Sequence, residues 1–328
     1  MTKTRVAVLR GGPSKEYDIS LQTGGEVIKS LQEDKYDVLD VLIDKDKRWF
    51  LFGKEMLPSR ILSMVDVAFN AMHGSYGEDG EVQKILDLQK IPYTGSGPLA
   101  SAMVMNKVFA KKHLENFDFD IVLPKHILLS PNIVYDLEKE AKNIFLKFPP
   151  PYIVKPITGG SSLNTVFVRT VAELPRILEE ILLTGFDVIV EEFIDGREIT
   201  VGVLENFRDE NVYTFIPVEI RKNDKNKVFG YEEKYTTSQK ISFSSNTLLP
   251  EEKKKIMKAS RDIHNAFGLR HYSRSDFILS KNGKLYFLET NSLPGMTKHS
   301  FLPAMAKEVG LPFDKLLEHI INLALNKI

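Results

Sequence analysis

The chain has 328 residues, of which 43% are hydrophobic and 27% are charged, a composition typical of an ordered globular protein with two or three compact subdomains. Lysine plus arginine and aspartate plus glutamate number 44 each, so no net charge indicates nucleic acid or an anionic membrane as a partner. The absence of cysteine excludes disulfides, cysteine-based zinc sites and thioester chemistry on the protein.

Targeting signals are missing from the sequence. The N-terminal stretch MTKTRVAVLR has an apolar run of only four residues, which is too short for the core of a signal peptide. No apolar stretch approaches the ~18 residues of a transmembrane helix. We therefore expect a cytoplasmic protein that binds neither membranes nor nucleic acid.

The first hundred residues alternate between predicted strands and helices. RVAVL (5–9) is typical of a short buried strand, and a helix with apolar residues at helical spacing follows it as far as Leu31. VDVAFNAMHG (65–74) predicts a second strand, and EVQKILDLQ (81–89) predicts a second helix. Pro98 then stands in the first turn of a further helix, where its missing N–H is harmless. This alternation predicts a parallel α/β unit.

The pattern changes after the prolines at 149–151. Five segments are typical of strands and hairpins: YIVKP, TVFVR, VIVEEFI, REITVGVL and YTFIPVEI. Helices are predicted at 251–268, ending at a glycine, and at roughly 313–327, where apolar residues form one stripe. The second half of the chain is therefore predicted to be α+β.

One hairpin carries a cluster of polar side chains. The segment YSRSDFILSKNGKLYFLETN (272–291) has Asn282-Gly283 between two alternating strands, which is a strong hairpin signal. If these two residues form the whole loop, two pairs of side chains meet on one face of the hairpin: Asp276 with Glu289, and Arg274 with Asn291. A slip of one residue would scatter these side chains.

Facing carboxylates repel each other unless a cation lies between them. A hard divalent cation is the natural candidate, because Mg²⁺ usually takes one or two carboxylates and completes its coordination with phosphate and water. A hairpin face whose carboxylates are merely solvated has the same spacing. The spacing alone favours neither interpretation.

A second candidate element is PYIVKPITGGSSLNTVFV (151–168), in which a strand ends at Lys155 and a Gly/Ser loop follows. A lysine there supplies a charge for a phosphate, and the N–H groups of residues 159–162 can close over phosphate oxygens. An ordinary flexible hairpin is the alternative. The P-loop pattern GxxxxGK[ST] is absent, and the turn GGPSKE lacks the glycine pattern of dinucleotide-binding folds.

Acidic residues follow in VIVEEFIDGREITV (188–201). Glu191 and Glu192 end one strand, and Glu198 begins the next. These carboxylates could accept hydrogen bonds from an adenine amino group and ribose hydroxyls. Taken in isolation, solvent-facing charges beside a turn are the preferred interpretation.

Together these elements resemble the D-alanine–D-alanine ligases of the ATP-grasp superfamily. The resemblance covers nearly the whole chain, since RGGPSKEYDISLQTG, MHGSYGEDGEVQ, YTGSG, KPITGGSS, EEFIDGREITV, YEEKY, RSDF and LETNSLPGMTKHS occur in the family's order. It implies an N-terminal parallel α/β domain (1–103) followed by a two-subdomain ATP-grasp fold. The central subdomain would span 104–192, and the C-terminal subdomain, with the metal and substrate residues, 193–328.

The resemblance also implies an activity. ATP would drive the ligation of two D-alanines to D-alanyl-D-alanine through a D-alanyl phosphate, for peptidoglycan precursor synthesis. Two Mg²⁺ or Mn²⁺ ions would assist, and the enzyme would be a homodimer. A related ligase with another acceptor (D-serine, D-lactate or another amino acid) is the nearest alternative. A non-catalytic nucleotide-binding regulator and a nicotinamide oxidoreductase are the more distant ones.

Site residues are assigned by their match to the family's motifs. Seven residues would bind ATP: Lys107, Lys155 and Lys234 at the phosphates, Glu191 and Glu198 at adenine and ribose, and Phe193 and Ile194, through their backbone, beside the base. Three would bind the metal ions: Asp276, Glu289 and Asn291.

The remaining assignments concern the amino acid substrates. Glu16 would receive the ammonium group of the first D-alanine, with His73 nearby, and Ser300 would hold the carboxylate of the second. Two donors would stabilise the tetrahedral oxyanion: Arg274 and the N–H of Gly295. Two lid residues would join Glu16 in a hydrogen-bonded group: Ser161 and Tyr235, the latter favouring a dipeptide over an ester product.

Overall fold

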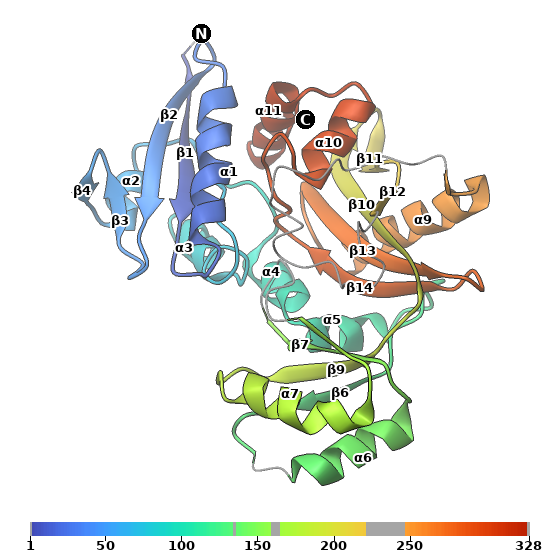
Figure 1. Cartoon of the computed structure of the whole chain (residues 1–328). Helices are drawn as coiled ribbons and strands as arrows, with labels where there is room; N and C mark the ends of the chain where they lie inside the picture. The colour runs from blue at the N-terminus through green and yellow to red at the C-terminus, as the bar shows by residue number, and fades with distance from the viewer. Residues whose placement is uncertain (1, 134–135, 159–164, 221–246, 327–328) are drawn as a thin grey trace.

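A computed structural model describes the protein at residues 2–133, 136–158, 165–220 and 247–326. Within these ranges the strands form three sheets, each with its own helices (Figure 1). Three of the residues assigned above, Ser161, Lys234 and Tyr235, lie outside the described residues.

The N-terminal sheet has the strand order β4-β3-β2-β1-β5, with β1 parallel to both β2 and β5. Its strands are β1 (Thr4–Gly11), β2 (Tyr36–Ile43), β3 (Trp49–Leu51), β4 (Lys54–Glu55) and β5 (Val67–Asn70), and its helices are α1 (Tyr17–Ser30), α2 (Pro58–Leu62) and α3 (Glu81–Leu88). The apolar runs that predicted strands here are buried because helices cover the sheet. The predicted parallel α/β unit is confirmed for β2, β1 and β5, while β3 and β4 extend the sheet in antiparallel pairs.

The central sheet is antiparallel throughout, in the order β6-β9-β7-β8. Its strands are β6 (His126–Leu129), β7 (Tyr152–Pro156), β8 (Val166–Val168) and β9 (Val188–Glu192), and its helices are α6 (Leu137–Lys147), the 3₁₀ turn η1 (Val171–Glu173) and α7 (Leu174–Leu182). The apolar residues of α6 and α7 pack on one face of this sheet. The helices α4 (Pro98–Met105) and α5 (Lys107–Leu114) lie between this sheet and the third (Figure 1).

The C-terminal sheet has the order β11-β10-β13-β14, with β12 also paired to β10. Its strands are β10 (Gly196–Phe207), β11 (Glu210–Thr214), β12 (Val218–Ile220), β13 (Tyr272–Ser280) and β14 (Leu285–Asn291), and its helices are α9 (Pro250–Ala266), α10 (Phe301–Glu308) and α11 (Phe313–Ala324). One face packs on α9, while part of the other packs on α10 and α11. The segment YTFIPVEI, predicted as one strand, is divided between β11 and β12.

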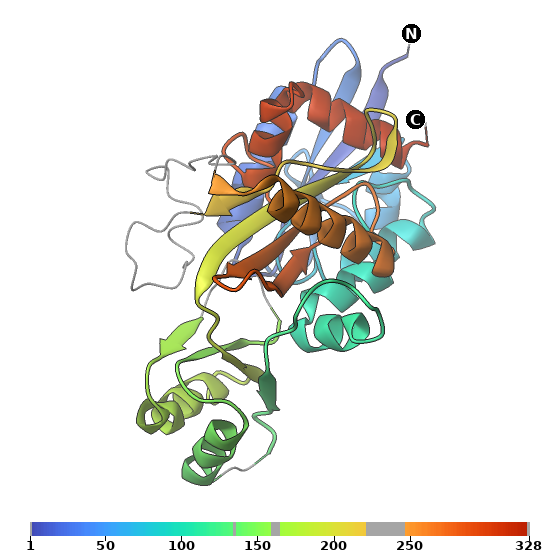
Figure 2. The same ribbon diagram turned by 90° about the vertical axis from the view of Figure 1, so that its right-hand side faces the viewer.

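The N-terminal and C-terminal sheets are joined by shared packing. Apolar residues of α11 belong to the same buried cluster as residues of β1 and β5, so the C-terminal helix seals the N-terminal sheet. In Figure 2 the N-terminal sheet lies behind α10 and α11, and the central sheet forms the opposite end of the molecule. The boundary predicted after residue 103 falls inside α4. In the described part of the chain, no helix is both long and apolar enough to cross a membrane.

The hairpin β13–β14 has the predicted side-chain pairs but not the predicted loop. Ser280 faces Lys284, and Gly283, with φ +77°, closes a three-residue loop. This loop displaces the register by one residue, so that Phe277 faces Phe287. A bulge at Leu288 then restores the register, and Asp276 faces Glu289 after all. The prediction of a two-residue loop was wrong. The predicted pairs are nevertheless correct, because the bulge reverses the register shift that the longer loop introduces.

Candidate active site

The bulge in β14 decides which side chains reach the candidate metal face. In a regular strand Phe287 and Glu289 would share one face. Because Leu288 has no partner across the hairpin, Phe287 packs in the core beside Phe277 while Glu289 lies beside Asp276 on the opposite face. One face of the sheet therefore gathers polar side chains from three adjacent strands: Glu198 and Thr200 of β10, Arg274 and Asp276 of β13, and Glu289 and Asn291 of β14.

Each candidate metal ligand has a polar partner. Asp276 is buried and accepts hydrogen bonds from Thr200 at 2.6 Å and from Arg274 at 3.0 and 2.9 Å. The Oε2 atom of Glu289 lies 3.5 Å from Nζ of Lys107. Asn291 Oδ1 accepts a hydrogen bond from the N–H of Leu293 at 2.9 Å. The carboxylates are thus compensated by cations, as closely spaced carboxylates must be.

The donor set fits a hard divalent cation. It consists of two carboxylates and one amide oxygen from adjacent strands, which is the oxygen-rich ligand type that Mg²⁺ takes when phosphates supply the remaining positions. Within the described ranges no group of three or more His, Cys, Asp and Glu side chains gathers as a metal site. A complete metal shell made by the protein alone is therefore not formed by these residues.

A second cluster lies where α5 meets the central sheet. Glu191 of β9 is buried, with Oε2 lying 2.7 Å from Nζ of Lys155 and Oε1 lying 2.8 Å from Nζ of Lys111. Burial opposes ionisation of Glu191, but attraction to Lys111 and Lys155 outweighs it and lowers the pKa of Glu191 to about 2. Lys107, one helical turn before Lys111, joins this cluster to Glu289.

Burial acts to lower the pKa of all three lysines in this cluster, but the net direction of the pKa shift differs between them. Burial lowers the pKa of both Lys107 and Lys111, against the attraction of the nearby carboxylates. Burial also acts on Lys155, but attraction to Glu191 and Glu289 is stronger there, so the pKa of Lys155 is raised. The cluster holds three ammonium groups next to two carboxylates, which suits a region that must accept further negative charge.

Lys111 was not singled out from the sequence. It is adjacent to Lys112, which is exposed, in the run AKKH. The neighbouring residues in the sequence do not distinguish the two lysines. The available signal was its spacing of four residues from Lys107, which places both ammonium groups on one face of a helix. Its partner Glu191 lies eighty residues away in sequence, on a different element.

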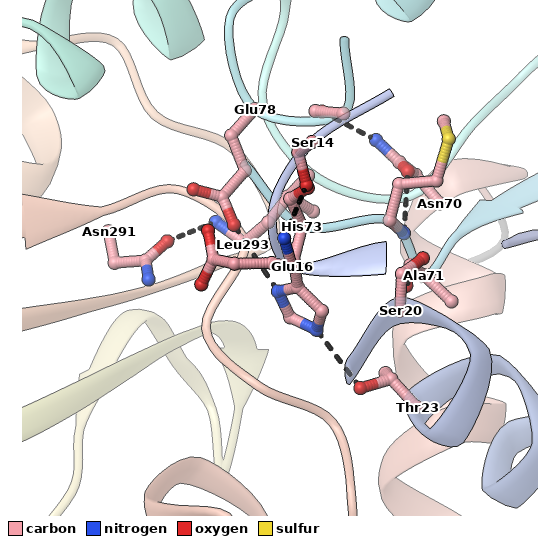
Figure 3. Close-up of polar contacts among 12 residues, drawn as sticks. Ser14, Glu16, Ser20, Thr23, Asn70, Ala71, His73, Glu78, Asn291 and Leu293 are labelled. Carbon is pink, nitrogen blue, oxygen red and sulfur yellow. Dashed lines mark hydrogen bonds and ion pairs between the residues drawn. The ribbon is translucent and has the colours of Figure 1, made fainter. Parts of the chain in front are cut away.

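The third group of side chains lies between the N-terminal sheet and the end of β14 (Figure 3). His73 is buried, and its ring nitrogens lie 3.0 Å from Thr23 Oγ1 and 3.3 Å from Glu78 Oε1. Glu16 is buried at the start of α1. The backbone at Gly74, where φ is +71°, comes close to the Glu16 carboxylate, since a Cβ at this position would lie 2.9 Å from Glu16 Oε2.

Glu78 links this group to the other two. It is 8% exposed, and it lines one small cavity together with Lys107, Glu289 and Asn291. In Figure 3 its carboxylate points toward Asn291 and Glu16. Glu78 was not assigned from the sequence, although the motif HGSYGEDG contains it. The cavity brings together residues of the N-terminal part, α5 and β14.

The turn after β14 is closed by a hydroxyl group. Ser300 Oγ accepts a hydrogen bond from the N–H of Thr297 at 3.1 Å and lies 2.8 Å from the Thr297 hydroxyl. A Cβ at Gly295 would lie 2.9 Å from Ser300 Oγ, so a larger residue at this position would displace the Ser300 hydroxyl. Ser300 directly precedes α10, whose N-terminal N–H groups favour an anion such as a carboxylate.

The remaining assigned residues lie around the junction of β9 and β10. Phe193 follows β9, its N–H donates to the carbonyl of Pro151 at 3.1 Å, and its ring packs on Phe167. Ile194 is half-buried beside it, and Glu198 lies on the same sheet face as Asp276. The described assigned residues thus fall into neighbouring groups, while Ser161, Lys234 and Tyr235 cannot be placed among them because they lie outside the described residues.

Comparisons with known proteins identify the family. A family model described as the D-ala D-ala ligase C-terminus matches residues 116–322, and the model of the N-terminus matches residues 5–61 and 54–96. The chain belongs to the D-alanine–D-alanine ligase family. The D-alanine–D-alanine ligase of Geobacter sulfurreducens is 37% identical over 326 residues, covering 99% of this chain and 95% of its own length. That of Aquifex aeolicus is 38% identical, covering 97% of this chain and 100% of its own length.

Solved structures of the family have the same fold. The VanG D-Ala:D-Ser ligase of Enterococcus faecalis superposes with a TM-score of 0.82 at 30% identity, over 98% of this chain and 100% of that chain. The D-alanine–D-alanine ligase of Bacillus anthracis, solved in complex with ATP, gives a TM-score of 0.77 at 30% identity, over 99% and 98%. The expected ATP-grasp ligase fold is confirmed, and the neighbours include ligases with two different acceptors.

Proposed function

We propose that this chain is an ATP-dependent, ADP-forming ligase that joins two D-alanines to D-alanyl-D-alanine for peptidoglycan precursor synthesis. Full-length membership of the D-alanine–D-alanine ligase family supports this activity. The observation that carries it in the structure is the contact between Lys107 and Glu289. It brings a candidate phosphate ligand of α5 next to a candidate metal ligand of β14, as transfer of the γ-phosphoryl group requires.

The first step forms the acyl phosphate. A carboxylate oxygen of the first D-alanine attacks the γ-phosphorus of ATP, the bond from that phosphorus to the β–γ bridging oxygen breaks, and ADP leaves. Glu16 holds the amino acid by its ammonium group, with His73 nearby, while Lys107, Lys155 and Lys234 hold the phosphates. Positioning of this kind supplies most of the catalysis in phosphoryl transfer.

Divalent cations belong to the proposal. Asp276, Glu289 and Asn291 would hold Mg²⁺ or Mn²⁺, and two bound ions would neutralise the charge of the β- and γ-phosphates. Asp276 is paired with Arg274, and Glu289 is paired with Lys107, so both carboxylates already have cationic neighbours.

The second step forms the peptide bond. The amine of the second D-alanine attacks the acyl carbon, the resulting tetrahedral oxyanion collapses, phosphate leaves, and the nitrogen loses its extra proton. Arg274 and the N–H of Gly295 would stabilise the oxyanion, and Ser300 at the start of α10 would hold the carboxylate. Ser161, Tyr235 and Glu16 would close the site, because water would otherwise hydrolyse the acyl phosphate.

Acceptor choice is the point at which a second candidate function has specific support. Phe301 follows Ser300 and its ring lies 5.7 Å from the Arg274 guanidinium, next to the proposed acceptor position. One of the similar structures is a D-Ala:D-Ser ligase. D-Serine is therefore the leading alternative acceptor, with D-lactate or another amino acid behind it.

Further parts of the proposal concern organisation. The chain would act in the cytoplasm as a homodimer, with residues 1–103, 104–192 and 193–328 as its three domains. Glu191 and Glu198 would bind adenine and ribose, with the backbone of Phe193 and Ile194 beside the base. Sedimentation of the purified protein would test the dimer.

The test of the activity is an acceptor screen. Purified protein with ATP, Mg²⁺ and D-alanine should release phosphate and ADP in equal amounts and form the dipeptide. D-Serine or D-lactate added to a limiting concentration of D-alanine should give mixed products at lower rates. Phosphate release only with another acceptor would favour the ligase with that acceptor over the D-alanine–D-alanine ligase. No phosphate release with any acceptor would contradict both functions.

A further inference from the structure

Lys111 is a buried charged residue that none of the assigned roles uses. Its side chain is 0% exposed, whereas those of Lys107 and Lys155 are 10% and 11% exposed. The Lys111 ammonium group is therefore closed off from a nucleotide that the other two could contact. Burying an ammonium group without a partner is strongly unfavourable, and Glu191, 2.8 Å away, is the partner that compensates it.

Glu191 has one lysine at each of its oxygens. Oε1 lies near Lys111 of α5, and Oε2 lies near Lys155 of β7. Lys155 reaches Glu191 diagonally across the β7–β9 pair, since Ile153 is the residue that directly faces Glu191. The two contacts thus come from different elements, and one can be exchanged while the other remains.

The proposed binding of ATP draws on this arrangement. If Lys155 turns to a phosphate oxygen, Oε2 of Glu191 loses its cation and becomes available to the amino group of adenine. Glu191 is 2% exposed, so water cannot compensate the charge that Lys155 leaves behind. Lys111 stays at Oε1 throughout, because its side chain is enclosed.

We propose that Lys111 is a positioning residue for nucleotide binding: it holds Glu191 in place and charged, so that Lys155 can move to the phosphates while Oε2 accepts adenine. This inference rests on the proposed function, because it uses the roles of Lys155 and Glu191. It couples the recognition of phosphate to the recognition of the base. A lysine that only fills space in the core would not couple them.

The charges around Lys111 agree with this role. Glu191 attracts it, whereas Lys155 and Lys107 repel it. Movement of Lys155 toward a phosphate removes one of the two repulsions at Lys111. The attraction between Lys111 and Glu191 is then opposed only by Lys107. The geometry therefore favours Lys111 as the partner that Glu191 keeps.

The test compares Lys111→Met with Lys112→Met, which removes the exposed neighbouring charge from the same helix. Binding of MgADP is measured by calorimetry, and the KM for ATP is measured with kcat. We expect Lys111→Met to weaken MgADP binding at least tenfold and to raise the KM for ATP more than it lowers kcat. Lys112→Met should stay within twofold of the unmodified protein. MgADP binding by Lys111→Met as tight as that of the unmodified protein would overturn the proposal.

A double-variant comparison separates positioning from general packing. In the Glu191→Gln background, Lys111 has no carboxylate to hold, so adding Lys111→Met should weaken MgADP binding less than threefold further. A further loss as large as in the unmodified background would show that Lys111 acts independently of Glu191 and would overturn the proposal. If Lys111→Met alone does not fold, the double variant is compared with Glu191→Gln alone. A loss of MgADP affinity below threefold supports the proposal, and a loss of tenfold or more overturns it.

The two proposals fail separately in these measurements. A protein that binds MgADP with the expected pattern of losses but never releases phosphate with D-alanine would contradict the ligase activity and leave the role of Lys111 in place. A protein that makes the dipeptide at normal rates, with MgADP binding insensitive to Lys111→Met, would contradict only the role of Lys111.

Discussion

The metal face and the lysine cluster differ in how far apart their residues lie in sequence. Asp276, Glu289 and Asn291 belong to a single hairpin, so local strand pairing brings them together. Lys107, Lys155 and Glu191 belong to a helix and two strands from different parts of the chain, and only tertiary packing unites them. The difference indicates that local strand pairing holds the proposed metal ligands, whereas the proposed nucleotide-binding residues depend on the relative placement of whole elements.

The largest effect should come from the metal face. Glu289→Gln keeps the shape of the side chain but removes the charge that would bind a divalent cation, and such a cation contributes several kcal/mol to the transition state. We expect kcat to fall roughly a thousandfold, since about 1.4 kcal/mol corresponds to tenfold. Phosphate release and a thermal melt would measure activity and folding.

The matched control for this change is Tyr286→Phe, which removes only a hydroxyl from the same strand. Tyr286 faces Ile278 and lies on the other side of the bulge from Glu289. It should keep near-normal rates. If Glu289→Gln also kept them, the metal assignment of this face would be wrong.

The next effect tests the lysine cluster. Lys155→Met removes a buried partner of Glu191 and a proposed phosphate ligand. MgADP binding should weaken roughly a hundredfold, because truncating one member of a buried charge pair costs about 2–5 kcal/mol. Calorimetry would measure it, with Lys112→Met as the control.

The two variants together sharpen the comparison. Glu289→Gln should lower kcat while MgADP still binds, and Lys155→Met should weaken MgADP binding first. If Glu289→Gln abolished nucleotide binding and Lys155→Met left it intact, the division between the two regions would be incorrect.

A change outside both regions tests whether stability can be separated from chemistry. His271 precedes β13, and its Nδ1 accepts a hydrogen bond from the N–H of Gly95 at 3.0 Å, joining the N-terminal part to the C-terminal sheet. Burial, reinforced by Arg270, lowers the pKa of His271 to about 4. Protonation would place a proton on the accepting nitrogen, so the neutral form is the one that stabilises the fold.

The sign of the pH effect follows from this direction. The unfolded chain protonates His271 near pH 6.5 and the folded chain near pH 4, so the stabilisation is complete above pH 6.5 and is lost as the pH falls toward 4. The loss should amount to roughly 3 kcal/mol. Urea unfolding across this range would measure it.

His271→Asn provides the comparison, because asparagine tolerates the positive φ of +67° and offers an uncharged acceptor. Its stability should depend less on pH between 4 and 6.5 than that of the unmodified protein. An unchanged pH dependence would mean that another group is responsible.

The smallest effect concerns the support of the metal face. Thr200 donates a hydrogen bond to Asp276 at 2.6 Å from the neighbouring strand. Thr200→Val removes a hydrogen bond to a carboxylate, which contributes about 1.5–3 kcal/mol to stability. Because Arg274 still holds Asp276 by two hydrogen bonds, kcat should fall only a few-fold. A loss comparable to that of Glu289→Gln would mean that Thr200 has a more direct role.

The sequence predicted the hairpin pairs because alternation and a turn signal are local properties. The loop length and the bulge at Leu288 were not predictable, since the residues LYFLETN show the same alternation with or without the bulge. The two offsets cancel, so the predicted pair of Asp276 with Glu289 is correct although the predicted loop is not.

The lysine cluster was predictable only in part. Motifs indicated Lys107, Lys155 and Glu191 individually, and no sequence pattern indicates that Glu191 pairs with two lysines at once. Lys111 and Glu78 were missed because their significance depends on partners far away in sequence or on a shared cavity. Tertiary packing, rather than local propensity, decides which of two adjacent lysines is buried.

Oxygen transfer tests the central claim most directly. With D-alanine labelled by ¹⁸O in its carboxylate, attack of that carboxylate on ATP leaves one labelled oxygen in the phosphate released for each dipeptide formed. We expect this labelled phosphate to form in step with D-alanyl-D-alanine. Unlabelled phosphate accompanying dipeptide formation would contradict the acyl phosphate route that the two regions are proposed to carry out together.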